Sequence, residues 1–137
     1  MSDDNNGKPS TREEILASLA RRRYRNVPLP FAGITVRIQS LSEQEWASYL
    51  AAMKPVYDSQ GKATVDPINS MDAERKLVGL GVVDHKDERV FKQPEDAGGF
   101  APPDVDILAD AIKQITVVSR DQTEALVKNS ETTSDDG

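Results

Sequence analysis

The chain has 137 residues, which suits one domain, and its hydrophobic fraction of 37% allows one modest core. Its net charge of −6 argues against nucleic acid as the main partner, and the absence of cysteine from the sequence excludes disulfides and thiolate metal sites. Because the sequence shows no signal peptide and no apolar run long enough to span a bilayer, we expect a soluble protein of the cytoplasm without a membrane partner.

Both ends of the sequence are polar and acidic. Residues 1–9 carry a net charge of −1 and residues 129–137 a net charge of −3, and neither segment contains enough apolar side chains to join a core. Such segments cannot offset the entropy lost on ordering. We therefore predict disordered tails at 1–9 and 129–137 around a single globular domain at 10–128.

The first predicted element is a helix that begins at Ser10. Ser10 and Glu13 have the spacing of a capping box, in which two side chains bond to free backbone N–H groups. The apolar side of this helix comprises Ile15, Leu16 and Leu19. It is expected to run into the arginine-rich residues 21–25 and to stop near Pro28, because the residue before a proline avoids helical angles.

An antiparallel hairpin should follow. Apolar and polar residues alternate over 34–38, which is the period of a strand with one buried face. A turn at Ala32 and Gly33 would join this strand to an extended partner at 27–31. Pro28 and Pro30 confine that partner to a sheet edge, since proline donates no ladder hydrogen bond.

Ser42 and Glu45 repeat the capping-box spacing and predict a second helix. Its helical stripe consists of Trp46, Tyr49, Leu50 and Met53. A loop is expected up to about Ser70, followed by a third helix over 71–80 whose end is weakened by Gly79 and Gly81.

Patterns in the C-terminal third of the sequence predict further helices. The apolar pairs 82–83 and 90–91 flank a polar stretch and predict a short hairpin or an extended loop. Residues 98–103 contain two glycines and two prolines, which predict a flexible break. Asp104 would then cap a fourth helix, and Ser119 a short final one. The predicted class is α+β, a mainly α-helical small domain with an N-terminal antiparallel β-hairpin and disordered termini.

Signals for catalysis are weak. His85, the single histidine, lies in a charged turn where nothing would tune its pKa. Asp84, Asp87 and Glu88 lack the spacing of a calcium loop, and 79–81 lacks the third glycine and following helix of a nucleotide loop. We therefore predict no catalytic, cofactor-binding or metal-binding residues, and a protein that is not an enzyme.

Two features are candidates for partner binding. The first is a cluster of four arginines around Tyr24: Arg21, Arg22, Arg23 and Arg25. It could contact nucleic acid, place cations favourably at a helix C-terminus, or dock acidic protein segments. The second is the pair Trp46 and Tyr49, which could grip a partner helix or belong to the core.

Three segments carry a resemblance to a known family. Residues 27–43 contain VPLP and GITVRIQSLSE, residues 73–91 contain AERKLVGLGVVD and then RVF, and LVKNS follows the last main helix at 126–130. In this order they resemble the tail assembly chaperones of long-tailed (siphovirus-like) bacteriophages. The resemblance covers about 110 residues, with no counterpart for the arginines at 21–25 or the glycines at 98–99.

The resemblance implies a chaperone that binds and solubilises the tape measure protein during tail assembly in the host cytoplasm and is absent from the finished virion. It also implies a longer frameshifted form that recruits the tail tube protein. Lys128 and Asn129 can be encoded by an adenine-rich run that permits slippage, a hypothesis that the gene's nucleotides would test. Self-association is a further expectation. The alternatives are a structural phage protein, such as a head–tail connector or minor tail component, and a small DNA-associated regulator.

Overall fold

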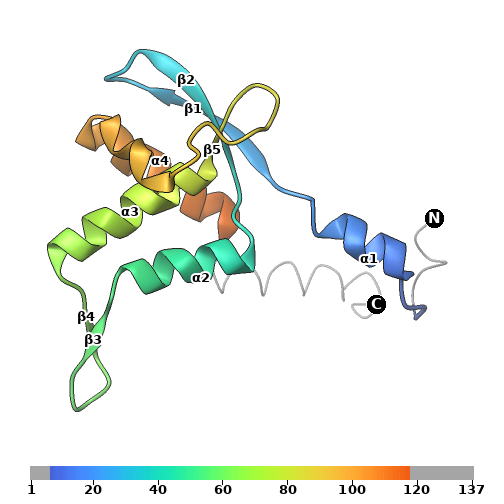
Figure 1. The fold of residues 1–137 in the computed structure, drawn as a ribbon, viewed down its shortest axis with the longest axis horizontal. Coiled ribbons are helices and arrows are strands. Elements are labelled where there is room, and N and C mark those ends of the chain that lie inside the picture. Colours follow the sequence, from blue (N-terminus) through green and yellow to red (C-terminus); the bar gives the residue numbers. More distant parts are fainter. Residues whose placement is uncertain (1–6, 118–137) are drawn as a thin grey trace, which may run out of the picture.

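In the computed structural model, which describes residues 7–117, helices pack on one face of a three-stranded antiparallel sheet (Figure 1). This confirms the predicted α+β class and the N-terminal hairpin. The predicted C-terminal tail, the final helix at Ser119 and most of the N-terminal tail lie outside the described residues. The elements in chain order are α1 (Arg12–Ser18), β1 (Tyr24–Leu29), β2 (Ile34–Gln39), α2 (Glu43–Ala52), β3 (Val56–Tyr57), β4 (Ala63–Thr64), α3 (Pro67–Gly81), β5 (Val82–Val83), the 3₁₀ helix η2 (Pro94–Gly99) and α4 (Pro102–Thr116).

The sheet has the strand order β1-β2-β5, so β1 lies at an edge, as its prolines predicted. Val27 pairs with Val36 in the β1–β2 hairpin, and Gly33 adopts φ +73° in the connecting turn. β5 pairs with β2, and Val83 bridges to Arg89 across the 84–88 turn. The short hairpin predicted around that turn is therefore present.

The predictions for the first helix were wrong at both ends. Thr11, not Ser10, is the N-cap, and it forms the capping box with Glu14. The helix ends at Ser18, because none of its residues is buried and pairing with β2 draws the chain into a strand from Tyr24. Residues 21–25 therefore form a linker and the start of β1, which excludes the interpretation of these arginines as helix-terminal cations.

The second predicted capping box is correct, with Ser42 and Glu45 at the start of α2. The long loop predicted after α2 is wrong in part. β3 and β4 form a small hairpin there, and α3 begins at Pro67 with Asp66 as its N-cap. The Asp66 side chain accepts a hydrogen bond of 2.8 Å from the N–H of Ile68, which starts the helix several residues early.

The glycines near the end of α3 have a packing role that the sequence did not reveal. Gly79 and Gly81 are buried within α3 rather than fraying its end. η2 packs directly on α3 and buries Ala97, so the flexible break predicted over 98–103 is wrong. The prolines of that segment form the first turn of α4, where a missing N–H costs nothing.

Asp104 is not the N-cap of α4, because the helix starts at Pro102 and its N-cap is Ala101. Asp104 is buried instead, with 1% of its surface exposed. Its carboxylate accepts hydrogen bonds from the backbone N–H groups of Phe31 at 3.4 Å and Ala32 at 3.0 Å. It thereby fastens the β1–β2 turn to the start of α4.

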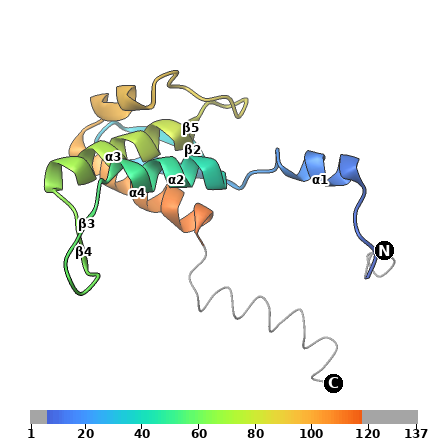
Figure 2. The same cartoon turned by 60° about the horizontal axis from the view of Figure 1, so that its bottom comes forward.

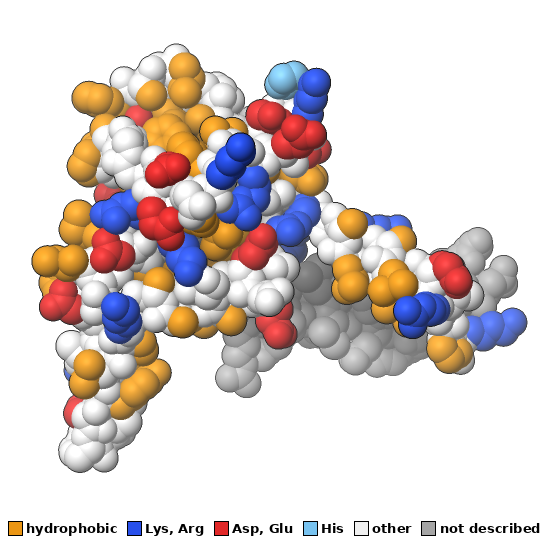
Figure 3. Space-filling view, in the orientation of Figure 1, with side chains coloured by type: hydrophobic (Ala, Val, Ile, Leu, Met, Phe, Trp, Pro, Cys, Tyr) orange, Lys and Arg blue, Asp and Glu red, His pale blue; other side chains and the backbone are white. Residues whose placement is uncertain are grey.

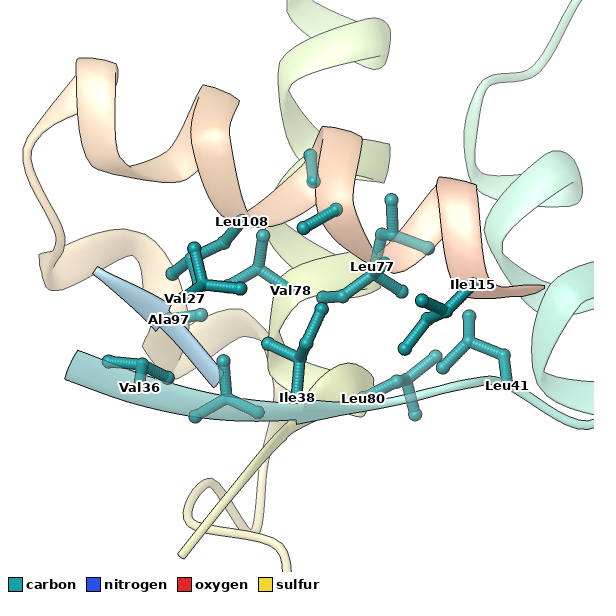
Figure 4. Packing of buried hydrophobic residues seen from close by; sticks show 14 of the residues in the cluster. Val27, Val36, Ile38, Leu41, Leu77, Val78, Leu80, Ala97, Leu108 and Ile115 are labelled. Carbon is teal, nitrogen blue, oxygen red and sulfur yellow. The ribbon is translucent and has the colours of Figure 1, made fainter. Parts of the chain in front are cut away.

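The core lies between the sheet and the helices α3 and α4 (Figure 4). Ile38 from β2 meets Leu77 and Val78 from α3 and side chains from α4 in this layer. Burying one large apolar side chain stabilises the folded state by about 1.5–3 kcal/mol relative to leaving that side chain exposed. The core therefore ties together segments from both halves of the chain. The completely or almost completely buried large apolar residues are Leu29, Ile38, Leu77, Val78, Leu108 and Ile112.

Candidate partner-binding surface

Arg22 fastens the segment before β1 to the start of α2. Its guanidinium donates to the carboxylate of Glu45 at 2.6 Å and to the backbone oxygen of Ser40 at 2.9 Å. Burial raises the pKa of Glu45, but Arg22 and the hydrogen bonds from Ser42 outweigh it, so the pKa lies below its ordinary value. The half-buried Arg22 is thus engaged within its own chain.

Two further arginines reach the C-terminal end of α4. Arg23 donates to the backbone oxygen of Thr116 at 3.2 Å, and Arg25 donates to the side-chain oxygen of Gln114 at 2.8 Å. Both arginines are exposed. Arg21 is exposed in the linker, and within residues 7–117 its side chain forms no hydrogen bond or ion pair. The exposed guanidiniums keep N–H groups free for an acidic partner.

Trp46 and Tyr49 lie one turn apart on α2 with ring centroids 5.0 Å apart. Tyr49 belongs to the core, with 5% of its surface exposed, whereas Trp46 is half-buried at the edge of the core. Lys113 of α4 lies over the Tyr49 ring at 5.8 Å and pairs with Glu74 at 3.6 Å. Burial lowers the pKa of Lys113, but Tyr49, Glu74 and Asp110 together raise it above its ordinary value.

These contacts bring most of the predicted binding residues to one region, where the linker before β1 meets α2 and the end of α4. We call it the α2–α4 surface, formed by Arg21, Arg22, Arg23, Arg25 and Trp46. Tyr49 lies beneath this surface and supports Trp46 rather than facing a partner. Arg22 holds the linker against the start of α2. Arg21, Arg23 and Arg25 are exposed and present guanidinium groups that a partner could contact.

A groove of about 600 Å³ lies between β2, β5 and the 84–91 loop, and no pattern in the sequence indicated it. Its apolar lining includes Val83, Phe91 and Phe100. Arg37 lines the groove, where its guanidinium pairs with Asp87 at 2.5 Å and lies over the Tyr24 ring, 4.6 Å from the ring centroid. The alternation of β2 indicated that Arg37 faces outward, but no local signal indicated that the 84–91 loop would fold over this face.

His85 lies exposed at the rim of this groove. The neighbouring Asp84 accepts hydrogen bonds from the backbone N–H groups of Glu88 and Lys86, which lower its pKa. Those bonds shape the turn. Across residues 7–117, no three His, Cys, Asp or Glu side chains are grouped to hold a metal ion. Over the same residues, no helix has the length and apolar character needed to cross a membrane.

The architecture is similar to a solved protein structure, the tail assembly chaperone of bacteriophage HK97. The two structures superpose with a TM-score of 0.52 and 17% sequence identity, covering 78% of this chain and 99% of the HK97 chain. This chain has a tail assembly chaperone-like fold. No family model matches the sequence, and no curated protein matches it either. At this identity the likeness establishes the fold, while partners and function are matters of proposal.

Proposed function

We propose that this chain is a phage tail assembly chaperone that binds and solubilises the tape measure protein during tail assembly in the host cytoplasm. The observation that carries the proposal is the fold, which matches nearly the whole of the HK97 chaperone. A chaperone of this kind binds rather than catalyses, and it leaves before the virion is complete. In keeping with the family resemblance, a longer frameshifted form would recruit the tail tube protein.

The acidic net charge of the chain and its exposed side chains support such a role. A tape measure protein is long and helical, and exposed apolar stripes on it would aggregate without a partner. Many copies of a small acidic protein would keep such a target dispersed, and individually weak contacts would allow later release. The α2–α4 surface supplies mixed chemistry for contact with a partner helix, with Trp46 as the apolar group and the arginines beside it.

The contacts of the arginines bear on the rival proposal of a DNA-associated regulator. Arg22 is committed to Glu45 and Ser40, which reduces its ability to bind phosphate. Arg21, Arg23 and Arg25 are exposed, but the chain as a whole carries −6. Binding to duplex DNA that weakens steeply with salt would support the regulator instead.

The test is co-expression of the tagged full chain with the tape measure protein of the same phage. We expect several copies to co-purify with a tape measure protein that is insoluble alone, and the chain to be absent from purified virions. The variant Arg21→Glu/Arg25→Glu should weaken recovery of the complex. Lys86→Glu/Lys92→Glu makes the same change of charge at exposed positions elsewhere and should not.

Each negative result of this experiment has a different interpretation. If the tape measure protein stays insoluble with the wild-type chain, the chaperone proposal is wrong. If the chain is found in finished virions, a structural tail or connector protein is the better description. If both double variants retain the complex, the chaperone proposal stands and its binding surface lies elsewhere, with the groove beside Arg37 as the next candidate.

A further inference from the structure

The C-terminal end of α4 lies beside the arginines of the α2–α4 surface. Arg23 donates to the backbone oxygen of Thr116, the last residue of α4, at 3.2 Å, and the hydroxyl of Thr116 accepts from the N–H of Leu41 at 3.0 Å. In both ribbon views the end of α4 lies next to the start of α2 (Figures 1 and 2). The chain after α4 therefore continues from a point beside this surface.

The positive charge of this surface is mostly unpaired within the described part of the chain. Only Arg22 of the four arginines pairs with a carboxylate within residues 7–117, and its partner is Glu45. Arg23 and Arg25 donate to neutral oxygen atoms of α4. Figure 3 shows basic side chains where the segment that leads to α1 leaves the body of the molecule. Since a guanidinium has five N–H groups and can bind a carboxylate through two of them, the surface is suited to an acidic ligand.

The sequence after α4 carries the opposite charge. Residues 118–137 contain five acidic and two basic side chains, a net charge of −3. Both basic residues precede 129, so residues 129–137 contain Glu131, Asp135 and Asp136 and no cation. Half of the net charge of the chain, −3 of −6, thus falls in nine residues that follow α4.

The connection to α4 is long enough for these carboxylates to reach the arginines of the same chain. Glu131 follows Thr116 by 15 positions, and 15 residues can extend to about 50 Å. Arg23 is bonded to Thr116 itself, so the distance to be covered is a small part of that length. A short flexible tether holds its end at an effective concentration of about millimolar. The tail therefore has an advantage over a partner that is present at micromolar concentration.

We propose that residues 129–137 dock on Arg21, Arg23 and Arg25 of their own chain and cover the α2–α4 surface until an acidic partner segment displaces them. Exposed ion pairs are individually weak and are screened by salt, so the tail exchanges on and off the surface. A partner segment with several carboxylates binds the same guanidiniums and must compete with the tail. The tail thereby selects against weakly acidic partners, a role that rests on the proposed function of this surface.

The first test measures the position of the tail in the purified full chain alone. The sequence contains no cysteine, so Ser134→Cys provides a single site for a nitroxide label next to Asp135. In the NMR spectrum at low salt, the label should broaden the amide signals of Arg21, Arg23 and Arg25 more than those of the 84–91 loop. The extra broadening should disappear at about 1 M salt, where the Debye length falls to about 3 Å.

Charge variants of the labelled chain identify the docking site. Arg21→Glu/Arg25→Glu should abolish the extra broadening, whereas Lys86→Glu/Lys92→Glu makes the same change of charge elsewhere and should retain it. Equal broadening of all exposed amides overturns the proposal, as does extra broadening that survives the arginine substitutions or is lost in the lysine control. Circular dichroism should show both variants folded, and Arg21→Gln/Arg25→Gln replaces the charge reversal if it is not.

The second test measures the competition, with a fluorescein-labelled hexaglutamate peptide as the acidic probe. Glu131→Gln/Asp135→Ser/Asp136→Ser removes the acidic side chains of the tail. This variant should bind the peptide at least about threefold more tightly than the wild type, because the apparent affinity rises with the fraction of chains whose surface is free. Equal affinities, or no binding by the variant, overturn the proposal. Both tests omit the tape measure protein, so their results stay separate from the test of the chaperone function.

Discussion

Gly79→Ala should destabilise the protein, although alanine is the better helix former. Gly79 lies inside α3 where η2 crosses it, and an added Cβ would lie 2.5 Å from the carbonyl carbon of Pro94 and closer still to its oxygen and Cα. These are backbone atoms, which cannot rotate away. To restore an ordinary contact of 3.4 Å with the carbonyl carbon alone, η2 would have to move by about 0.9 Å, and it would have to move further to clear the oxygen and Cα.

The magnitude follows from two opposing terms. Replacing glycine by alanine within a helix gains about 1 kcal/mol. Forcing an extra methyl group into a packed interior costs about 1–3 kcal/mol and more where the backbone must shift, as it must at Pro94. Moving η2 also loosens the packing of the buried Ala97. We expect the free energy of unfolding to fall by about 2 kcal/mol, which for a domain of this size lowers the Tm by about 10 °C.

Urea unfolding followed by Trp46 fluorescence and far-ultraviolet circular dichroism measures this change. Gly99→Ala is the matched control, since a Cβ there would meet no atom within 4 Å. It should stay within about 0.5 kcal/mol of the wild type. A Gly79→Ala variant that is as stable as the wild type, or more stable, would refute the packing of η2 against α3.

Three other predictions concern polar contacts. Asp104→Ala should lower the free energy of unfolding in urea by about 2–3 kcal/mol, because two backbone N–H groups of the β1–β2 turn lose a buried carboxylate acceptor; an unchanged midpoint would contradict this. The pKa of Glu45 is lowered on folding, so the stability that its charge contributes is present above the unfolded-state pKa and is lost as the pH falls through the folded-state value. Glu45→Gln should therefore cost about 1 kcal/mol at neutral pH and nothing in strong acid, and a difference that persists in acid would exclude the charge as its cause. Ser42→Ala should cost about 1 kcal/mol of global stability, whereas Thr11→Ala should reduce only the helicity of α1, since α2 packs on α3 and α1 buries nothing; equal losses of global stability would show that α1 is part of the cooperative unit.

The sequence predicted those elements whose causes are local. The Ser42 capping box, the alternation over 34–38 and the edge prolines each act within a few residues, and each prediction is confirmed. The errors arose where distant residues decide the conformation. The segment with glycines at 98–99 looked flexible in isolation, but it forms a 3₁₀ helix because the buried Gly79 leaves room for η2 on α3.

In the candidate site, too, the sequence predicted the local features but not the long-range contacts. The composition of residues 21–25 was evident from the sequence, but the partners of Arg23 and Arg25 are about 90 positions away, at Thr116 and Gln114. The long-range contacts of the fold explain why residues 21–23, predicted to end a helix, instead form a linker held against α2 and α4. The groove beside Arg37 depends on the same kind of long-range contact, because the 84–91 loop must close over the sheet to form it.

The exposed apolar residues are separate from the residues that determine stability. α1 and the exposed residues Ile68 and Met71 contribute nothing to the buried core, so substitutions at Leu16 or Met71 should leave the free energy of unfolding unchanged. Tyr49 is the opposite case: only 5% of its surface is exposed, so a loss of binding in Tyr49→Ala would report unfolding as readily as a lost contact. Arg25→Glu is informative because its side chain is exposed and gives up a single hydrogen bond to Gln114. The proposed cycle of partner binding and release would use this separation, since contacts outside the core can be made and broken while the domain stays folded.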